Sequence, residues 1–237
     1  MMPEKAVRKA LAQGMQELNE NMVTLAELSE LAIRKAVDSL SRSDADVARE
    51  VFTLDQELYA LQEEIESNCV NLIALHAPVA RDLRAITTSL KITTDLDRIG
   101  RYAKDIAEIA LQFHGQIPPG LKDIVKIPRM ADLTIDMVDR ATQAFVNRDA
   151  ESVRNIMEVD DAVDNLHDEV FQEVVEHMRD GNLPIEAGAR YILVNRHLER
   201  IADHAVNIGE RVVYMVTGDR LPRVRAADRA KAKKRSP

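Results

Sequence analysis

The chain of 237 residues is 46% hydrophobic, 30% charged and only 3% aromatic. This length suits one large domain or two of ordinary size, and the apolar content is too high for a disordered chain. A formal net charge of −8 excludes a general nucleic-acid binder, which needs a basic surface. Eight glycines and eight prolines are too few turn residues for an all-β fold, so the composition favours helices.

Cysteine content and hydropathy predict the compartment. Cys69 is the only cysteine, so an intrachain disulfide is excluded and a reducing environment is expected. The first residues lack the apolar run of a signal peptide, and no segment approaches the ~18 apolar residues of a membrane helix. We therefore expect a cytoplasmic protein without direct membrane insertion.

Three helices are predicted in the first half of the chain. The clearest is the second, in which apolar residues from Val47 to Leu75 alternate spacings of four and three, as in the seam of a helical bundle. Ser43 or Asp44 is suited to cap its start. The same period runs more weakly through Met15–Ala36 before it and through Ile92–Phe113 after it.

The second half repeats this plan. Helix-breaking residues concentrate in His114–Gly120, and three further helices follow: one from Pro128, one starting at Asp149, and a last one. The apolar stripe Val194–Met215 of the last helix lies 102 positions beyond its counterpart in the third helix. We predict an all-α protein of two tandem three-helix bundles related by internal duplication, at 1–114 and 121–218, followed by a basic, flexible tail at 219–237.

A polar pattern is repeated with the helices. The stretch DRIGRYAKDI at 97–106 is echoed by ERIADHAVNI at 199–208. In the second copy, Glu199, Asp203 and Asn207 are four apart and share one helix face, roughly opposite the apolar stripe. This is either an ordinary solvated face or a row of oxygen ligands for a hard or borderline metal ion. Asp160 and Asp164 on the preceding helix are candidate further ligands.

The first copy departs from this pattern. Arg101 stands where the second copy has Asp203, so Asp97, Arg101 and Asp105 form an ion-pair ladder with i, i+4 spacing. Each such pair contributes only about 0.2–0.5 kcal/mol, but the guanidinium occupies the place that a cation would take. Asp97 and Asp105 are therefore doubtful metal ligands, and we expect binding at the second copy.

The histidines and the known catalytic motifs do not indicate an enzyme. His204 and His167 are interpreted as surface histidines. The spacing Asp164-x-x-His167 resembles half of a di-iron motif, but no second copy occurs. No P-loop, glycine-rich dinucleotide turn or nucleophile elbow is present, and we predict no catalytic residue.

Several motifs together resemble the PhoU family. They are PVARDLR at 78–84, LERIADHAVNI at 198–208 and VYMVTG at 213–218, and the resemblance covers nearly the whole chain. It implies two three-helix bundles, each with a Glu/Asp-x-x-x-Asp motif whose face binds metal ions or clusters. Glu199 and Asp203 match the second motif, whereas only Asp97 matches the first. The resemblance implies a divalent or trivalent metal ion, with Fe, Zn, Mn, Mg and Ni all open.

The resemblance also implies a function. It indicates a cytoplasmic, non-enzymatic and often homodimeric protein that negatively regulates phosphate uptake. The implied partners are the ATPase subunit of the phosphate ABC transporter and the phosphate-sensing histidine kinase; nucleic acid is not among them. No residues are singled out for partner binding. Two alternatives remain: a carboxylate-ligated metal-binding bundle or metalloenzyme, and a related bundle that serves a different permease.

Overall fold

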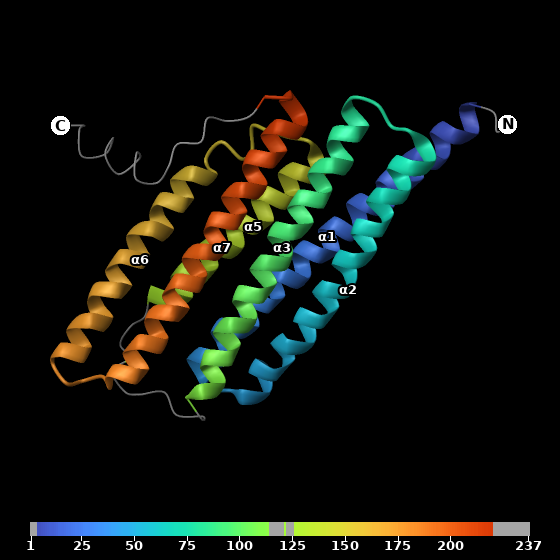
Figure 1. Ribbon diagram of the computed structural model, residues 1–237. Coiled ribbons are helices and arrows are strands. Elements are labelled where there is room, and N and C mark those ends of the chain that lie inside the picture. The colour runs from blue at the N-terminus through green and yellow to red at the C-terminus, as the bar shows by residue number, and fades with distance from the viewer. Residues whose placement is uncertain (1–3, 114–120, 122–125, 220–237) are drawn as a thin grey trace, which may run out of the picture.

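The protein is built from long α-helices. The computed structural model describes residues 4–113, 121 and 126–219, without the side chains of 4–7, and this part of the chain contains no strand (Figure 1). The main helices are α1 (Glu4–Arg42), α2 (Ala45–His76), α3 (Arg81–Gln112), α5 (Lys126–Asn147), α6 (Ile156–Arg179) and α7 (Ile185–Thr217). The predicted all-α fold is confirmed. The boundary predicted at 114–120 lies outside the described residues, as does the tail beyond Asp219.

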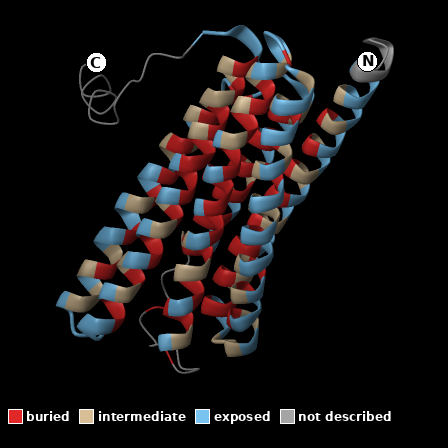
Figure 2. Ribbon diagram, turned by 45° about the vertical axis from the view of Figure 1, so that its right-hand side comes forward, coloured by how far each residue is buried: buried red, intermediate tan, exposed pale blue. Residues whose placement is uncertain are grey.

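The helices form two bundles that lie side by side. Helices α1, α2 and α3 contact one another, as do α5, α6 and α7. The bundles meet where α3 packs on α7 and α1 packs on α5, so α2 and α6 form the outer edges of a slab (Figure 1). Buried residues line the inner faces of all the helices and join into one hydrophobic core (Figure 2). None of the described helices is long and apolar enough to cross a membrane.

The turns that open α2 and α6 begin alike but continue differently. Oδ1 of Asp44 accepts hydrogen bonds from the backbone of Asp46 and Val47 at 3.0 and 3.1 Å, as predicted for the cap of α2. Its counterpart Asp149 accepts one such bond, yet α6 begins only at Ile156, so the predicted start at Asp149 is wrong. The intervening residues form tight turns that bury Val153 beside Gly209 of α7.

Helices α3 and α7 run antiparallel at the centre of the slab. Arg84 at the start of α3 donates to the carbonyl of Met215 near the end of α7, and Gln112 at the end of α3 accepts from Arg190 near the start of α7. Because the two helices are copies offset by 102 positions, this antiparallel pairing relates the bundles by a pseudo-two-fold axis. Positions that are equivalent in the two copies can therefore meet only near that axis.

The second contact between the bundles holds an acidic residue of altered pKa. Glu30 of α1 is half-buried, and Asp139 of α5 lies close enough to repel its charge. Burial, with this repulsion as a smaller cause, raises the pKa of Glu30 from 4.5 to about 7, while Arg34 opposes the shift. Above neutral pH the folded protein therefore carries an unfavourable buried charge between its bundles.

Replacing Glu30 by glutamine is expected to stabilise the protein at high pH only. Because the folded state holds this proton more tightly than the unfolded state, stability falls as pH rises from about 4.5 to about 7. Allowing for solvent screening of a half-buried group, the gain in Glu30→Gln is about 1 kcal/mol at about pH 8 and close to zero at about pH 4. Urea unfolding at both pH values measures it. The exposed Glu57→Gln is the control, and an equal gain at both pH values would contradict the expectation.

Candidate functional site

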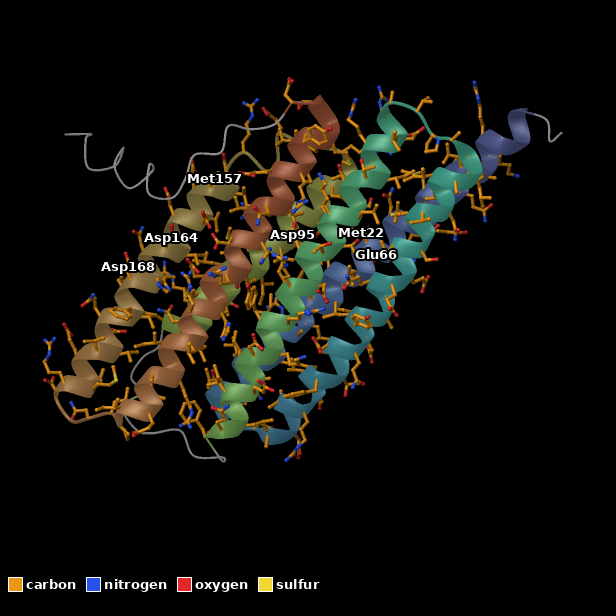
Figure 3. All side chains as sticks on the ribbon, in the orientation of Figure 1. Met22, Glu66, Asp95, Met157, Asp164 and Asp168 are labelled. Carbon is orange, nitrogen blue, oxygen red and sulfur yellow. The ribbon has the colours of Figure 1, made fainter. Side chains whose placement is uncertain are left out.

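The second copy of the acidic motif lies where α7 packs on α6. The side chain of Glu199 is 17% exposed, Asp203 is exposed one turn further on, and Asp164 extends from α6 (Figure 3). Burial raises the pKa of Glu199, with a further contribution from Asp203 and opposition from Arg196. Burial also raises the pKa of Asp164, again with contributions from Asp203 and from Asp161. The two helices therefore hold a cluster of mutually repelling carboxylates.

Two buried polar atoms near this cluster lack a hydrogen-bond partner among the described residues. Oε1 of Glu199 accepts from Nη1 of Arg196 at 2.7 Å, but Oε2 of Glu199 is unpaired, as is Nδ1 of His167. Leaving a buried acceptor unpaired costs about 1–3 kcal/mol. A cation or a water molecule bound to Oε2 would remove this cost, and a cation would also relieve the repulsion between the acids.

The other predicted ligands of this copy lie one turn away along the same helices. Asp160 is buried on α6 before Asp164, and Asn207 is half-buried on α7 after Asp203. Within the described part of the chain, no three His, Cys, Asp or Glu side chains converge as metal ligands. The donor chemistry suits an oxygen-preferring cation, but the side chains do not form a ready coordination shell. The expected outward direction of the row holds for Asp203 and not for Glu199, which α6 partly covers.

In the first copy only half of the predicted ion-pair ladder forms. Nε of Arg101 lies 3.0 Å from Oδ2 of Asp97, as expected. Asp105 does not join this pair, since it faces α7 and lies 3.9 Å from Nδ1 of His197. Burial raises the pKa of Asp105, and His197 partly offsets the shift. Asp97 and Asp105 therefore have different partners, Arg101 within α3 and His197 of α7.

A buried polar contact joins α3 to α7 at a place that none of the predicted sites includes. Asp95, which Figure 3 labels on α3, is 3% exposed and His204 is 7% exposed. Oδ1 of Asp95 is hydrogen-bonded to Nδ1 of His204 at 2.9 Å. Nε of Arg211 lies 2.7 Å from Oδ2 of Asp95, but its N–H bond is not aimed at that oxygen, so the contact is an ion pair without a hydrogen bond. The interpretation of His204 as a surface histidine is wrong.

The polar residues between α3 and α7, called the seam below, share a heptad spacing that is visible in the sequence. Asp95 and Tyr102 on α3 are seven residues apart, as are His197, His204 and Arg211 on α7. The ring of Tyr102 lies 5.7 Å from that of His197 and 5.8 Å from that of His204. Tyr102 and His204 occupy equivalent positions of the two copies, so their contact marks the pseudo-two-fold axis. The seam is thus a polar and aromatic junction between the bundles.

These features define a class of protein. The chain is a duplicated all-α protein in which two copies of a three-helix domain meet through a buried polar seam, and one copy keeps an acidic face. The model of the PhoU domain matches the sequence twice, at 22–110 and 127–212. The chain belongs to the PhoU family.

Relatives and solved structures agree over most of the chain. A phosphate-specific transport system accessory protein PhoU homolog of Deinococcus radiodurans is 33% identical over 90% of this chain and over its own full length. A Thermotoga maritima homolog of the same description is 34% identical, over 79% of this chain and 80% of its own. The crystal structure of PhoU from Pseudomonas aeruginosa superposes with a TM-score of 0.81 at 30% identity, covering 88% of this chain and 99% of that one.

Proposed function

We propose that this chain is a regulator of phosphate uptake and phosphate homeostasis that acts by protein contact. The observation that carries the proposal is the double match to the PhoU domain, together with relatives named as accessory proteins of phosphate-specific transport. The chain restrains the phosphate ABC transporter through its ATPase subunit. It also holds the phosphate-sensing histidine kinase in its phosphate-replete state, so the starvation response stays off.

The proposal places the protein in the cytoplasm, as a homodimer without catalytic activity. Its contact with the membrane is indirect, through the transporter. The long exposed helix faces of the slab support binding of partner proteins, because they offer rigid surfaces at both edges (Figure 2).

We further propose that the acidic face of the second copy binds a divalent or trivalent metal ion. Glu199 and Asp203 are the principal ligands, supported by Asp164 of α6, with Asp160 and Asn207 one turn away. The repulsion among these acids and the unpaired Oε2 of Glu199 support the assignment. A metal there would neutralise the cluster and tie α6 to α7, which would stiffen the surface offered to partners.

Removing the gene tests the regulatory function. We expect a deletion strain to express its phosphate-starvation genes in phosphate-rich medium, and the intact chain supplied from a plasmid to restore repression. A tagged chain should recover the transporter ATPase and the kinase from cells grown in high phosphate, and less of both from cells grown in low phosphate. Normal regulation in the deletion strain would overturn the proposal.

A further inference from the structure

Two arginines line a small cavity at one end of the slab. The cavity has a volume of about 240 Å³ and is lined by Arg81, Arg148, Met215 and Val216. Arg81 opens α3, Arg148 lies in the turn between α5 and α6, and the two apolar residues belong to the last turn of α7. Figure 1 shows these three segments at the same end of the molecule, so residues far apart in the sequence form the walls.

The charge on these two guanidinium groups is not compensated by a neighbouring acid. Neither Arg81 nor Arg148 forms an ion pair with any residue that the structure describes, although acids outnumber bases in the chain by 40 to 32. The nearby Arg84 differs, because its Nε donates to the carbonyl of Met215 at 3.4 Å. Asp82 lines the adjoining cavity, which Arg148 also borders, without pairing with either arginine.

The internal duplication shows that the fold does not require these arginines. The position equivalent to Arg148 is Ser43, and the two share a left-handed backbone with φ of 53° and 56°. The positions equivalent to Arg81 and Arg84 are Leu183 and Glu186. The equivalent positions at the opposite end of the slab carry none of the three arginines, although the turns there follow a partly different course. Arg84 has a structural contact with Met215, but no side-chain hydrogen bond or ion pair among the described residues explains Arg81 or Arg148.

We propose that this cavity binds a tetrahedral oxyanion of the phosphate type. A guanidinium offers two parallel N–H donors that match two oxygens of such an ion. Two arginines from different segments can donate to the ion from two sides. Met215 is buried and forms an apolar wall, whereas Val216 and both arginines are exposed, so an ion can reach the guanidinium groups from solvent. The start of α3 has no side-chain cap, so the positive end of the helix dipole also favours an anion near Arg81.

The size of the cavity favours a free ion over a larger ligand. Pockets that bury drug-sized ligands have volumes of about 300–1,000 Å³, and this cavity is smaller. Orthophosphate is the natural probe. Binding at this end is independent of the regulatory function proposed above, because it concerns arginines and segments that the acidic face does not share. A chain that binds no oxyanion can still regulate phosphate uptake through its partners. A chain that does not regulate uptake can still bind an oxyanion in this cavity.

Calorimetric titration of the purified full-length chain with orthophosphate tests the proposal. Ionic strength is kept constant with chloride, so that only specific binding gives a signal. We expect one saturable site per chain, and an affinity at least about tenfold weaker in the double variant Arg81→Gln/Arg148→Gln. The matched control is Arg42→Gln, which removes an exposed arginine beside Ser43 at the opposite end and should leave the affinity unchanged.

Further variants and ligands distinguish a specific oxyanion site from non-specific attraction and from lipid binding. Arg81→Lys keeps the charge but loses the two-pronged donor, so it should weaken binding and retain the helical content and melting temperature of the parent chain. The proposal is overturned by the absence of saturable binding against chloride, by unchanged affinity in a folded double variant, or by binding that occurs only with vesicles of anionic phospholipid. Competition by sulfate at similar concentration would support the site, since it shares the tetrahedral geometry.

Discussion

Replacing Asp95 by alanine is expected to lower the free energy of unfolding by about 3 kcal/mol. The side chain of Asp95 is only 4% exposed and serves two partners of α7, His204 at 2.9 Å and Arg211 at 2.7 Å. Its removal leaves the buried imidazole without a hydrogen-bond partner and Arg211 without its counter-charge. The cost is large because Asp95 and His204 lie between the bundles, where water reaches them poorly; Arg211 is 30% exposed and contributes less.

Urea unfolding of the purified variants measures this loss. Asp46→Ala is the control, since the side chain of Asp46 is 89% exposed and pairs with the exposed Arg49; it should cost less than about 1 kcal/mol. A double-mutant cycle of Asp95→Ala with His204→Ala should give a coupling energy of about 1–3 kcal/mol. A loss in Asp95→Ala no larger than that of the control would show that the seam does not hold the bundles together.

The double variant Glu199→Gln/Asp203→Asn is expected to lose most of the metal bound by the protein while keeping its helical fold. Both substitutions preserve shape and remove charge, so the repulsion that a cation would relieve is removed with the ligands. Metal content after loading and dialysis is the measurement, for Fe, Zn, Mn, Mg and Ni in turn. Metal should also raise the melting temperature of the parent chain and leave that of the double variant unchanged.

The duplication supplies the control for this experiment. Asp97→Asn/Asp105→Asn removes two acids from the equivalent stretch of the first copy, where Arg101 stands at the position of Asp203 and Asp105 faces α7. Its metal content should match that of the parent chain. Unchanged metal content in Glu199→Gln/Asp203→Asn, or equal losses in the two double variants, would remove the assignment to the second copy.

Much of the architecture follows from local patterns in the chain. The alternation of spacings from Val47 to Leu75 predicts α2, and the offset of 102 between Ile92–Phe113 and Val194–Met215 predicts the duplicated bundle. Such patterns are readable because helical period depends only on residues a turn or two apart. The late start of α6 at Ile156 shows the limit, since the capping signal at Asp149 is local but the burial of Val153 against Gly209 is not.

The candidate sites were also predictable from the sequence only in part. The spacing of Glu199 and Asp203 is visible in the chain, and the structure adds the contribution of Asp164 from α6. The roles of Asp95 and His204 are not visible, because α3 and α7 each bury two faces: one against their own bundle and one against each other. The sequence shows one apolar stripe on each helix, so every residue outside that stripe is predicted to face solvent. His204 lies on the face of α7 that packs against α3, and its predicted exposure was therefore wrong.

Helix content and acid spacing were decided by residues close together in the sequence, and the duplication by comparing two stretches of that sequence. The direction in which each polar face points was decided by the packing of one bundle on the other. Asp97 and Asp105 illustrate the difference, since they share a predicted row but Asp97 pairs within α3 and Asp105 lies against His197 of α7. The physical reason is that the helical period fixes only which residues of one helix share a face. Whether a charge on that face is buried depends on which other helix packs against it.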